Sequence, residues 1–178
     1  MTKRNLITTA VALAVLLGAG VVAAPYLLAL LPAEIISTFS YTSELGEHVG
    51  GGDSQNYSKT NSQLSLTGDL AAVEFSVKTD SGYWSIRLQA PNGEKLHLGR
   101  YDKITATAAG TGKLPLLKVI SNGNECNEVY GNFSISQLQV DEAGKVTALA
   151  AEFVQSCESS TAPVLRGYIQ YQIPVVKR

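Results

Sequence analysis

The sequence predicts an all-β fold, an antiparallel β-sandwich or flattened barrel of eight to ten strands, preceded by one N-terminal hydrophobic helix. Three observations lead to this prediction. Apolar and polar residues alternate in short runs after residue 38, as they do in half-buried strands. Glycine, asparagine and aspartate separate these runs as turn residues do. No run after residue 38 repeats its apolar residues with the 3.6-residue period of a helix.

The first predicted element is the N-terminal segment, residues 1–36, and it carries the strongest signal in the chain. The sequence is uncharged from Leu6 to Leu31, and about 20 apolar residues suffice for a helix to cross the roughly 30 Å of hydrocarbon in a bilayer. Lys3 and Arg4 precede this stretch and Glu34 follows it. Because positive charge stays on the cytoplasmic side, we expect an exported protein with everything after the segment outside the cytoplasm.

Two fates of this segment stay open. Apolar content that continues to Leu31 exceeds the 7–15 residues of a usual signal-peptide core. It therefore favours a single-pass anchor at the cell envelope, which would contact the membrane through residues 6–31. Val21, Val22 and Ala23 are small enough for signal peptidase, so cleavage after Ala23 is the alternative and would release a secreted or periplasmic protein.

The predicted β-domain, residues 37–178, contains a hairpin in its first half. Apolar residues alternate over residues 73–77 and again over 84–88, and a glycine-containing turn lies between these runs. Two alternating runs joined in this way are typical of a β-hairpin. Asn92–Gly93 is a second turn signal, which predicts another strand over residues 95–98 with His97 in it.

The second half of the domain repeats this pattern with one irregularity. Apolar residues change parity between Ile135 and Leu138, which predicts a bulge near Ser136. The last run alternates from Leu165 to Ile173, which predicts that these two residues share one inward face. One core is expected from the inward positions of all runs, including Phe75, Trp84, Phe133, Phe153 and Ile169.

The two cysteines, Cys126 and Cys157, both lie in the exported part of the chain. An isolated pair in an oxidising compartment is usually joined, so a disulfide is expected. In the chain-entropy model, closing a loop of about 30 residues stabilises the fold by roughly 3–4 kcal/mol. The pair has neither Cys-x-x-Cys spacing nor nearby metal ligands, which argues against redox or metal chemistry.

Several short motifs in the domain belong together. They are Cys126–Asn127, Gly131–Phe133, Phe153–Glu158 and Pro163–Ile169, with Gly46–Gly52 upstream. This pattern resembles a module of exported bacterial proteins of unknown function, over most of residues 40 to 173. The resemblance implies an exported β-rich module with bridged cysteines, and it implies no activity.

Tyrosine, arginine and glutamine form two groups of candidate binding residues. By strand parity, Tyr83 and Arg87 lie opposite the apolar positions of their run, and Arg166, Tyr168 and Gln170 do so in the last run. Interfaces favour tyrosine and arginine, and flat aromatic rings beside amides also suit a glycan. An exposed sheet face without any partner would carry the same residues.

The surface around these residues would distinguish the two kinds of partner. If they gather on one concave sheet, a small ligand is favoured, whereas a flat apolar patch favours a protein partner.

No residue pattern points to catalysis or to a bound cofactor. His48 and His97 are the only histidines, and no Gly-x-Ser-x-Gly elbow accompanies them. Gly50–Asp53 lacks the Gly-Lys-Ser/Thr ending of a phosphate-binding loop. We therefore expect no catalytic residues, no metal and no cofactor, and a hydrolase is the least favoured alternative.

The charge balance narrows the classes of partner. Fourteen basic and fifteen acidic residues give a net charge of -1, so no long-range field attracts nucleic acid. The sequence leads us to expect a non-enzymatic envelope domain that acts in binding or assembly. A carbohydrate- or small-ligand-binding module of the same fold is the alternative.

Overall fold

The computed structural model describes residues 33–105 and 112–176, and every regular element in these residues is a β-strand. Eleven strands are formed: β1 (Ala33–Ser43), β2 (Ser54–Ser58), β3 (Gln63–Gly68), β4 (Ala72–Lys78), β5 (Tyr83–Gln89), β6 (Gly99–Asp102), β7 (Leu116–Ser121), β8 (Asn124–Glu125), β9 (Val129–Val140), β10 (Val146–Cys157) and β11 (Val164–Val176). The predicted all-β class is confirmed for this part of the chain. The predicted N-terminal helix lies outside the described residues.

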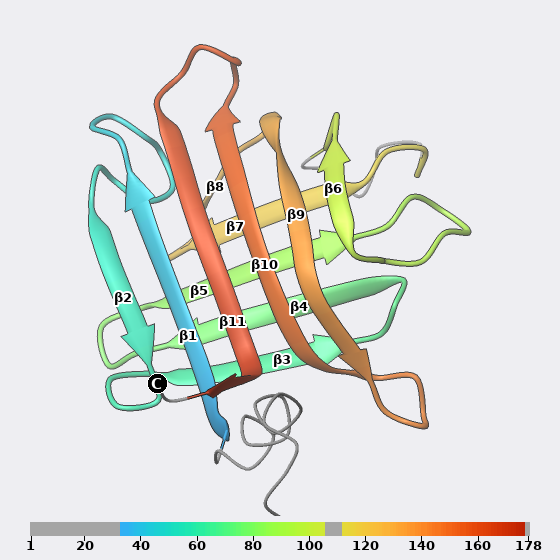
Figure 1. Cartoon of the computed structure of the whole chain (residues 1–178). Coiled ribbons are helices and arrows are strands. Elements are labelled where there is room, and N and C mark those ends of the chain that lie inside the picture. The colour runs from blue at the N-terminus through green and yellow to red at the C-terminus, as the bar shows by residue number, and fades with distance from the viewer. Residues whose placement is uncertain (1–32, 106–111, 177–178) are drawn as a thin grey trace, which may run out of the picture. The chain divides into compact units, whose positions relative to one another are not determined.

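The strands form two antiparallel sheets, and Figure 1 shows the strands of one crossing those of the other steeply. The six-stranded sheet has the order β2-β1-β11-β10-β9-β6, and the five-stranded sheet has the order β3-β4-β5-β7-β8. Eleven strands exceed the eight to ten that were predicted. The additional strands include β2, whose sequence Ser-Gln-Asn-Tyr-Ser has no apolar alternation, and β8, which has only two residues.

The two sheets pack face to face through large aromatic side chains. Phe39 of β1 is fully buried, and its ring centroid lies 6.0 Å from that of Phe75 and 5.5 Å from that of Trp84, both in the other sheet. The residues predicted to share one core all belong to this cluster and are at most 4% exposed: Phe75, Trp84, Phe133, Phe153 and Ile169. The parity assigned to these strands from the sequence is therefore confirmed.

Local features in both halves of the domain also follow the prediction. β4 and β5 form the expected hairpin, in which Val77 is paired with Trp84. Between β9 and β10, Ile135 is paired with Ala151 and Gln137 with Ala150, so Ser136 is the additional residue of a bulge. The predicted bulge is confirmed.

Two local predictions are wrong. Residues 95–98 form no strand, and His97 lies in the connection before β6, where the Tyr101 hydroxyl bonds to the backbone N–H and carbonyl of His97. In β11, Gln172 has a positive φ of 55°, which interrupts the alternation. Ile173 therefore belongs to a small cluster separate from the core that holds Leu165.

Residues 34–175 form one compact unit. Within residues 33–105 and 112–176, no helix is long and apolar enough to cross a bilayer. β1 begins at Ala33, before the start of the β-domain expected at residue 37.

Gly167 of β11 provides a test of the core packing. It is paired with Phe153 of β10, and a Cβ added at Gly167 would overlap the Phe153 ring. We expect Gly167→Ala to lower the free energy of unfolding by about 1–3 kcal/mol, as overpacking of a core does. Urea unfolding monitored by circular dichroism measures this loss.

Phe153→Leu gives the matched control for this prediction. Because the smaller side chain removes the overlapping ring atoms, the double variant should lose less stability than the sum of the two single variants. Strictly additive losses would show that the Gly167–Phe153 contact does not limit the packing.

Candidate functional site

The outer face of the six-stranded sheet carries a polar surface that lines an open groove. Alternation turns Leu165, Gly167 and Ile169 of β11 into the core, so Arg166 and Tyr168 point outward. We call six residues at the centre of this face the outer strip: Arg100, Asn132, Glu152, Val154, Arg166 and Tyr168. All six line one open groove with a volume of about 570 Å³.

The strand register arranges the strip in two rows across the sheet. In one row Tyr168 is paired with Glu152, Glu152 with Ser134, and Ser134 with Arg100. In the other row Arg166 is paired with Val154 and Val154 with Asn132. Since neighbouring strands lie about 4.8 Å apart, the first row crosses β11, β10, β9 and β6 over roughly 15 Å, and the second row crosses β11, β10 and β9.

The strip carries both signs of charge. Arg166 and Glu152 are exposed, and the Nε of Arg100 lies 2.9 Å from an Oδ1 of Asp102 in the same strand. Exposed ion pairs of this kind contribute little to stability, so these side chains can exchange partners at low cost. The strip can therefore offer both donors and acceptors to a polar partner.

Two tyrosines of the groove differ in exposure. Tyr168 is 40% exposed and presents its ring to solvent, whereas Tyr41 of β1 is buried, with its ring centroid 4.4 Å from that of Trp84 in the core. Burial raises the pKa of Tyr41 to about 12, with the neighbouring Tyr57 as the next cause. The Tyr41 hydroxyl therefore stays protonated at neutral pH.

The structure separates the five predicted binding residues into two groups. Arg166, Tyr168 and Gln170 lie on the outer side of β11, where Gln170 is half-buried and its Oε1 accepts a hydrogen bond of 3.3 Å from the Thr38 hydroxyl. Tyr83 and Arg87 lie on β5, in the other sheet, opposite the buried positions of that strand. Because the two sheets bury their inner faces against each other, these two groups do not share one surface.

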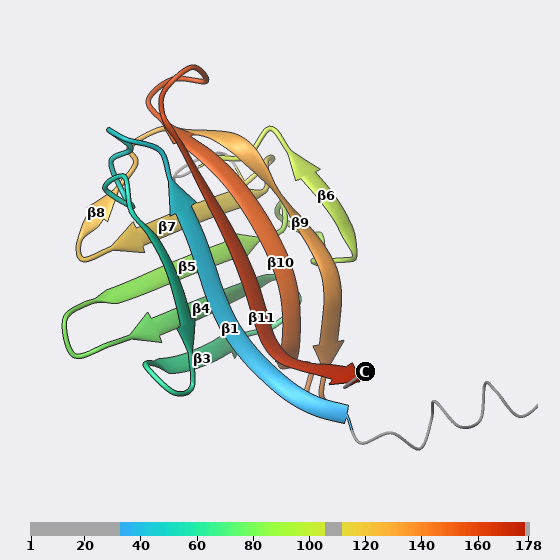
Figure 2. The same cartoon turned by 60° about the vertical axis from the view of Figure 1, so that its left-hand side comes forward.

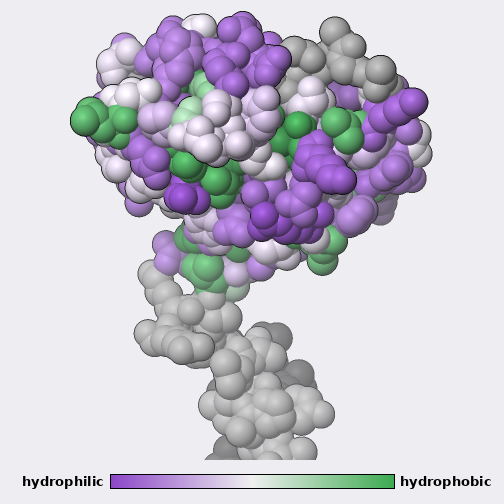
Figure 3. Space-filling view, turned by 90° about the horizontal axis from the view of Figure 1, so that it is seen from above, coloured by the Kyte–Doolittle hydropathy of each residue, from purple (hydrophilic) through white to green (hydrophobic). Residues whose placement is uncertain are grey.

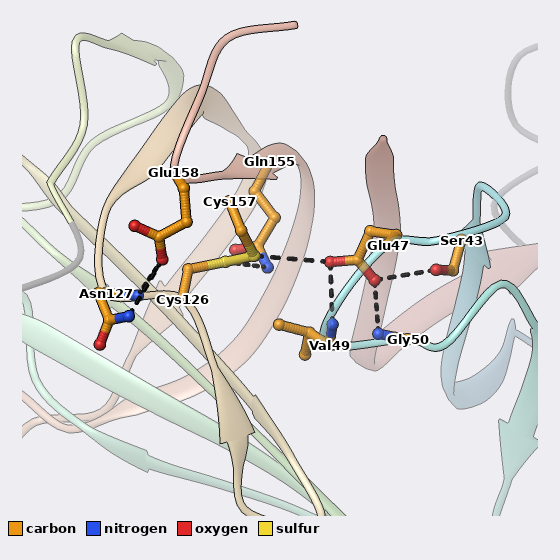
Figure 4. The surroundings of a disulfide bond; sticks show 9 residues. All are labelled: Ser43, Glu47, Val49, Gly50, Cys126, Asn127, Gln155, Cys157 and Glu158. Carbon is orange, nitrogen blue, oxygen red and sulfur yellow. Dashed lines mark hydrogen bonds between the residues drawn. A yellow bond between two sulfur atoms is a disulfide. The ribbon is translucent and has the colours of Figure 1, made fainter. Parts of the chain in front are cut away.

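The cysteines form the second notable region, at the end of the domain where β1 ends and β11 begins. Cys126 follows β8 and Cys157 ends β10, and the two are joined by a disulfide with a Cα–Cα distance of 5.0 Å. The predicted disulfide is confirmed. Figure 4 shows that Asn127 and Glu158 lie beside it, where the Glu158 carboxylate accepts bonds from the Asn127 backbone N–H and side-chain amide.

Glu47 is a feature of this region that the sequence did not reveal. Its carboxylate is buried, at 4% exposure, and accepts hydrogen bonds from the Ser43 hydroxyl at 2.9 Å and from the backbone N–H groups of Val49 and Gly50. These donors compensate the buried charge and fix the glycine-rich loop between β1 and β2. The only sequence signal was a single acidic residue between glycines, which is equally typical of an exposed turn.

The disulfide and the loop meet through Glu47 and Gln155. An Oε1 of Glu47 lies 3.8 Å from the Sγ of Cys157, and the Gln155 side-chain amide donates to the Sγ of Cys126 at 3.5 Å. Gln155 is fully buried, and its Oε1 has no hydrogen-bond partner among the described residues. The glycine-rich loop between β1 and β2 therefore contacts the disulfide through the Glu47 carboxylate.

One group of side chains has the composition of a metal site. One carboxylate oxygen of Glu47 and the sulfurs of Cys126 and Cys157 all lie within 4.8 Å of one another. The two sulfurs are bonded to each other in the disulfide, and a cysteine binds a metal as a thiolate. In the disulfide form the two cysteines therefore have a structural role.

The two histidines lie in different surroundings. His48 is exposed beside Glu47 and Glu158, along a groove of about 340 Å³. The His97 ring lies 5.1 Å from that of Tyr101, and its Nδ1 is 2.9 Å from the carbonyl oxygen of Leu98. Neither imidazole makes a hydrogen bond to a serine or a carboxylate within the described part of the chain.

The fold and the sites define the class as a disulfide-linked, two-sheet antiparallel β-domain with a polar outer strip. No protein-family model, no curated protein and no solved structure matches the chain.

Replacing Glu47 tests whether its hydrogen bonds stabilise the glycine-rich loop between β1 and β2. In Glu47→Ala the Ser43 hydroxyl and two backbone N–H groups lose their charged acceptor, so we expect the free energy of unfolding to fall by about 2–3 kcal/mol. Urea unfolding measures this loss, and hydrogen exchange should show faster exchange at the Val49 and Gly50 amides. Glu142→Ala is the control, since Glu142 is exposed in the turn between β9 and β10. Equal stability of both variants would contradict the role given to Glu47.

Proposed function

We propose that this chain is an exported, membrane-anchored, non-enzymatic β-domain that acts in binding at the cell envelope, with the outer strip as its binding surface. The uncharged stretch from Leu6 to Leu31, flanked by Lys3 and Arg4, supports export and anchoring. The disulfide between Cys126 and Cys157 supports an extracytoplasmic location, because disulfides persist in oxidising compartments.

The outer strip is the observation on which the binding function depends. Two exposed arginines, an exposed tyrosine and a glutamate come from three different strands and line one groove. Tyrosine and arginine are enriched at interfaces, because each combines a large contact area with hydrogen-bonding capacity. The framework of paired strands holds these side chains in fixed rows, which reduces the entropy lost on binding.

A protein partner with a polar surface of mixed charge fits the strip best. The charges alternate in sign across the strip, an arrangement that favours specificity and orientation in protein recognition. Figure 3 views the domain from one end, where hydrophobic residues form separate patches among hydrophilic ones. In the outer strip itself Val154 is the one aliphatic member, so the strip is suited to an interface of polar contacts.

A glycan is the second candidate partner. The exposed ring of Tyr168 lies in the same open groove as Arg166, Glu152 and Asn132. A flat aromatic face with hydrogen-bonding groups around it is suited to a sugar ring, which has apolar faces and polar edges.

A pair of tyrosines of similar exposure allows a controlled test of the strip. A photo-crosslinking phenylalanine analogue placed at Tyr168, which is 40% exposed, should yield a discrete crosslinked protein in intact cell envelopes. The same analogue at Tyr83, 46% exposed on the opposite sheet, is the matched control and should yield none. Gel electrophoresis and mass spectrometry of the purified adducts measure the result.

The outcomes separate the candidates. Adducts at Tyr168 that disappear with Arg166→Ala but persist with Arg87→Ala support a protein partner at the strip. Co-sedimentation with isolated cell-wall polysaccharide that is lost in Tyr168→Ala and kept in Tyr83→Ala supports the glycan. Identical behaviour of the Tyr168 and Tyr83 variants in both assays would show that the strip is not the binding surface.

A further inference from the structure

Four strand termini gather at the end of the domain where the described chain begins. The start of β1 lies beside the end of β11, where the Gln172 backbone N–H donates to the Ser37 hydroxyl at 3.1 Å (Figures 1 and 2). Val140 at the end of β9 is paired with Val146 at the start of β10, and β10 is paired with β11. We call this region, residues 34–36, 138–147 and 173–175, the proximal end.

The proximal end exposes large apolar side chains. Ile35 is 49% exposed and Val140 is 44% exposed. Half-buried Ile36 and Val175 pack on a small cluster of buried residues that is separate from the main core: Ala148, Ala150 and Ile173. The proximal end therefore carries exposed apolar side chains in addition to a small buried cluster of its own.

The sequence shows what lies next to this end of the domain. The apolar run of the N-terminal segment ends at Leu31, four residues before Ile35. Even a fully extended chain of four residues spans at most about 14 Å. The headgroup layer on each side of a bilayer is about 5–8 Å thick. If Leu31 lies at the edge of the hydrocarbon, Ile35 cannot be far beyond the headgroups.

We infer that the proximal end of the domain rests on the lipid headgroups, with Ile35 and Val140 as its contact residues. The inference deepens the proposed function and depends on the membrane anchoring proposed there. Apolar side chains at a bilayer surface enter the boundary between headgroups and acyl chains, where they lose contact with water. The partner of this surface is the outer face of the bilayer that the N-terminal segment crosses.

Among the described residues, charge at the proximal end is mainly acidic. The acidic residues are Glu34, Asp141 and Glu142, together with Asp69, which forms an isolated β-bridge with the one basic residue described there, Lys145. An excess of acidic groups gives no attraction to anionic lipid. The contact with an uncharged lipid surface should therefore change little with salt, because apolar side chains supply it.

The full chain reconstituted in phosphatidylcholine vesicles tests this inference. The vesicles contain a phosphatidylcholine with a nitroxide on its headgroup, which quenches nearby tryptophan fluorescence. Ile35→Trp and Val140→Trp are the reporters, and Leu45→Trp is the matched control, since Leu45 is 92% exposed just beyond the other end of β1. The parent chain supplies the baseline, because its one tryptophan, Trp84, is buried in the core.

We expect quenching of the Ile35→Trp and Val140→Trp reporters to exceed that of Leu45→Trp several-fold, with or without added salt. Equal quenching of all three variants in vesicle-bound protein overturns the inference and leaves the anchor intact. If the full chain does not float with the vesicles, the proposed anchoring fails, and the inference fails with it. All three positions are exposed, and urea unfolding of each variant verifies that the fold is kept.

Discussion

The constraint on which the rest of the structure depends is the burial of one face of each sheet against the other. Phe39, Phe75 and Trp84 meet across the sheets and leave no freedom in strand parity. A shift of one residue in any of these strands would move a large aromatic side chain into water. Once that parity is fixed, the outward residues follow, and Arg166 and Tyr168 can point only away from the core.

The end of the domain with the disulfide is held by polar interactions. The buried Glu47 carboxylate gathers a hydroxyl and two backbone N–H groups around itself, and it lies against the disulfide. A charge in this position is stable only because each of its donors is in place. The glycine-rich loop is therefore held mainly by hydrogen bonds to Glu47, with Val49 as its buried apolar side chain.

Local features of the fold could be predicted from the sequence, and features that depend on distant pairing could not. The hairpin of β4 and β5 and the bulge at Ser136 were visible because alternation and its interruption are local signals. β2 escaped prediction because its polar sequence is ordered by pairing with β1. The positive φ of Gln172, by contrast, could not be predicted, because the apolar residues alternate on both sides of it.

In the candidate site, too, local features could be predicted from the sequence, and features that depend on distant strand pairing could not. Parity alone placed Arg166, Tyr168 and Gln170 on one outer face, and the structure has them there. Arg100 could not be added from the sequence, because it reaches the strip through the register of β6 with β9 and of β9 with β10. Tyr83 and Arg87 looked equivalent to Arg166 and Tyr168, since parity does not tell which sheet a strand joins.

The proposed function and the proposed lipid contact both require that the N-terminal segment remains attached to the β-domain. The most direct measurement separates membrane from soluble fractions of cells and determines the intact mass of the chain in each. We predict a membrane-bound species that retains Met1 to Arg178, with a mass lower by two hydrogens because the cysteines are joined. A soluble species that begins near Ala24 would contradict the account, because neither an envelope-anchored function nor a lipid-contacting end would then remain.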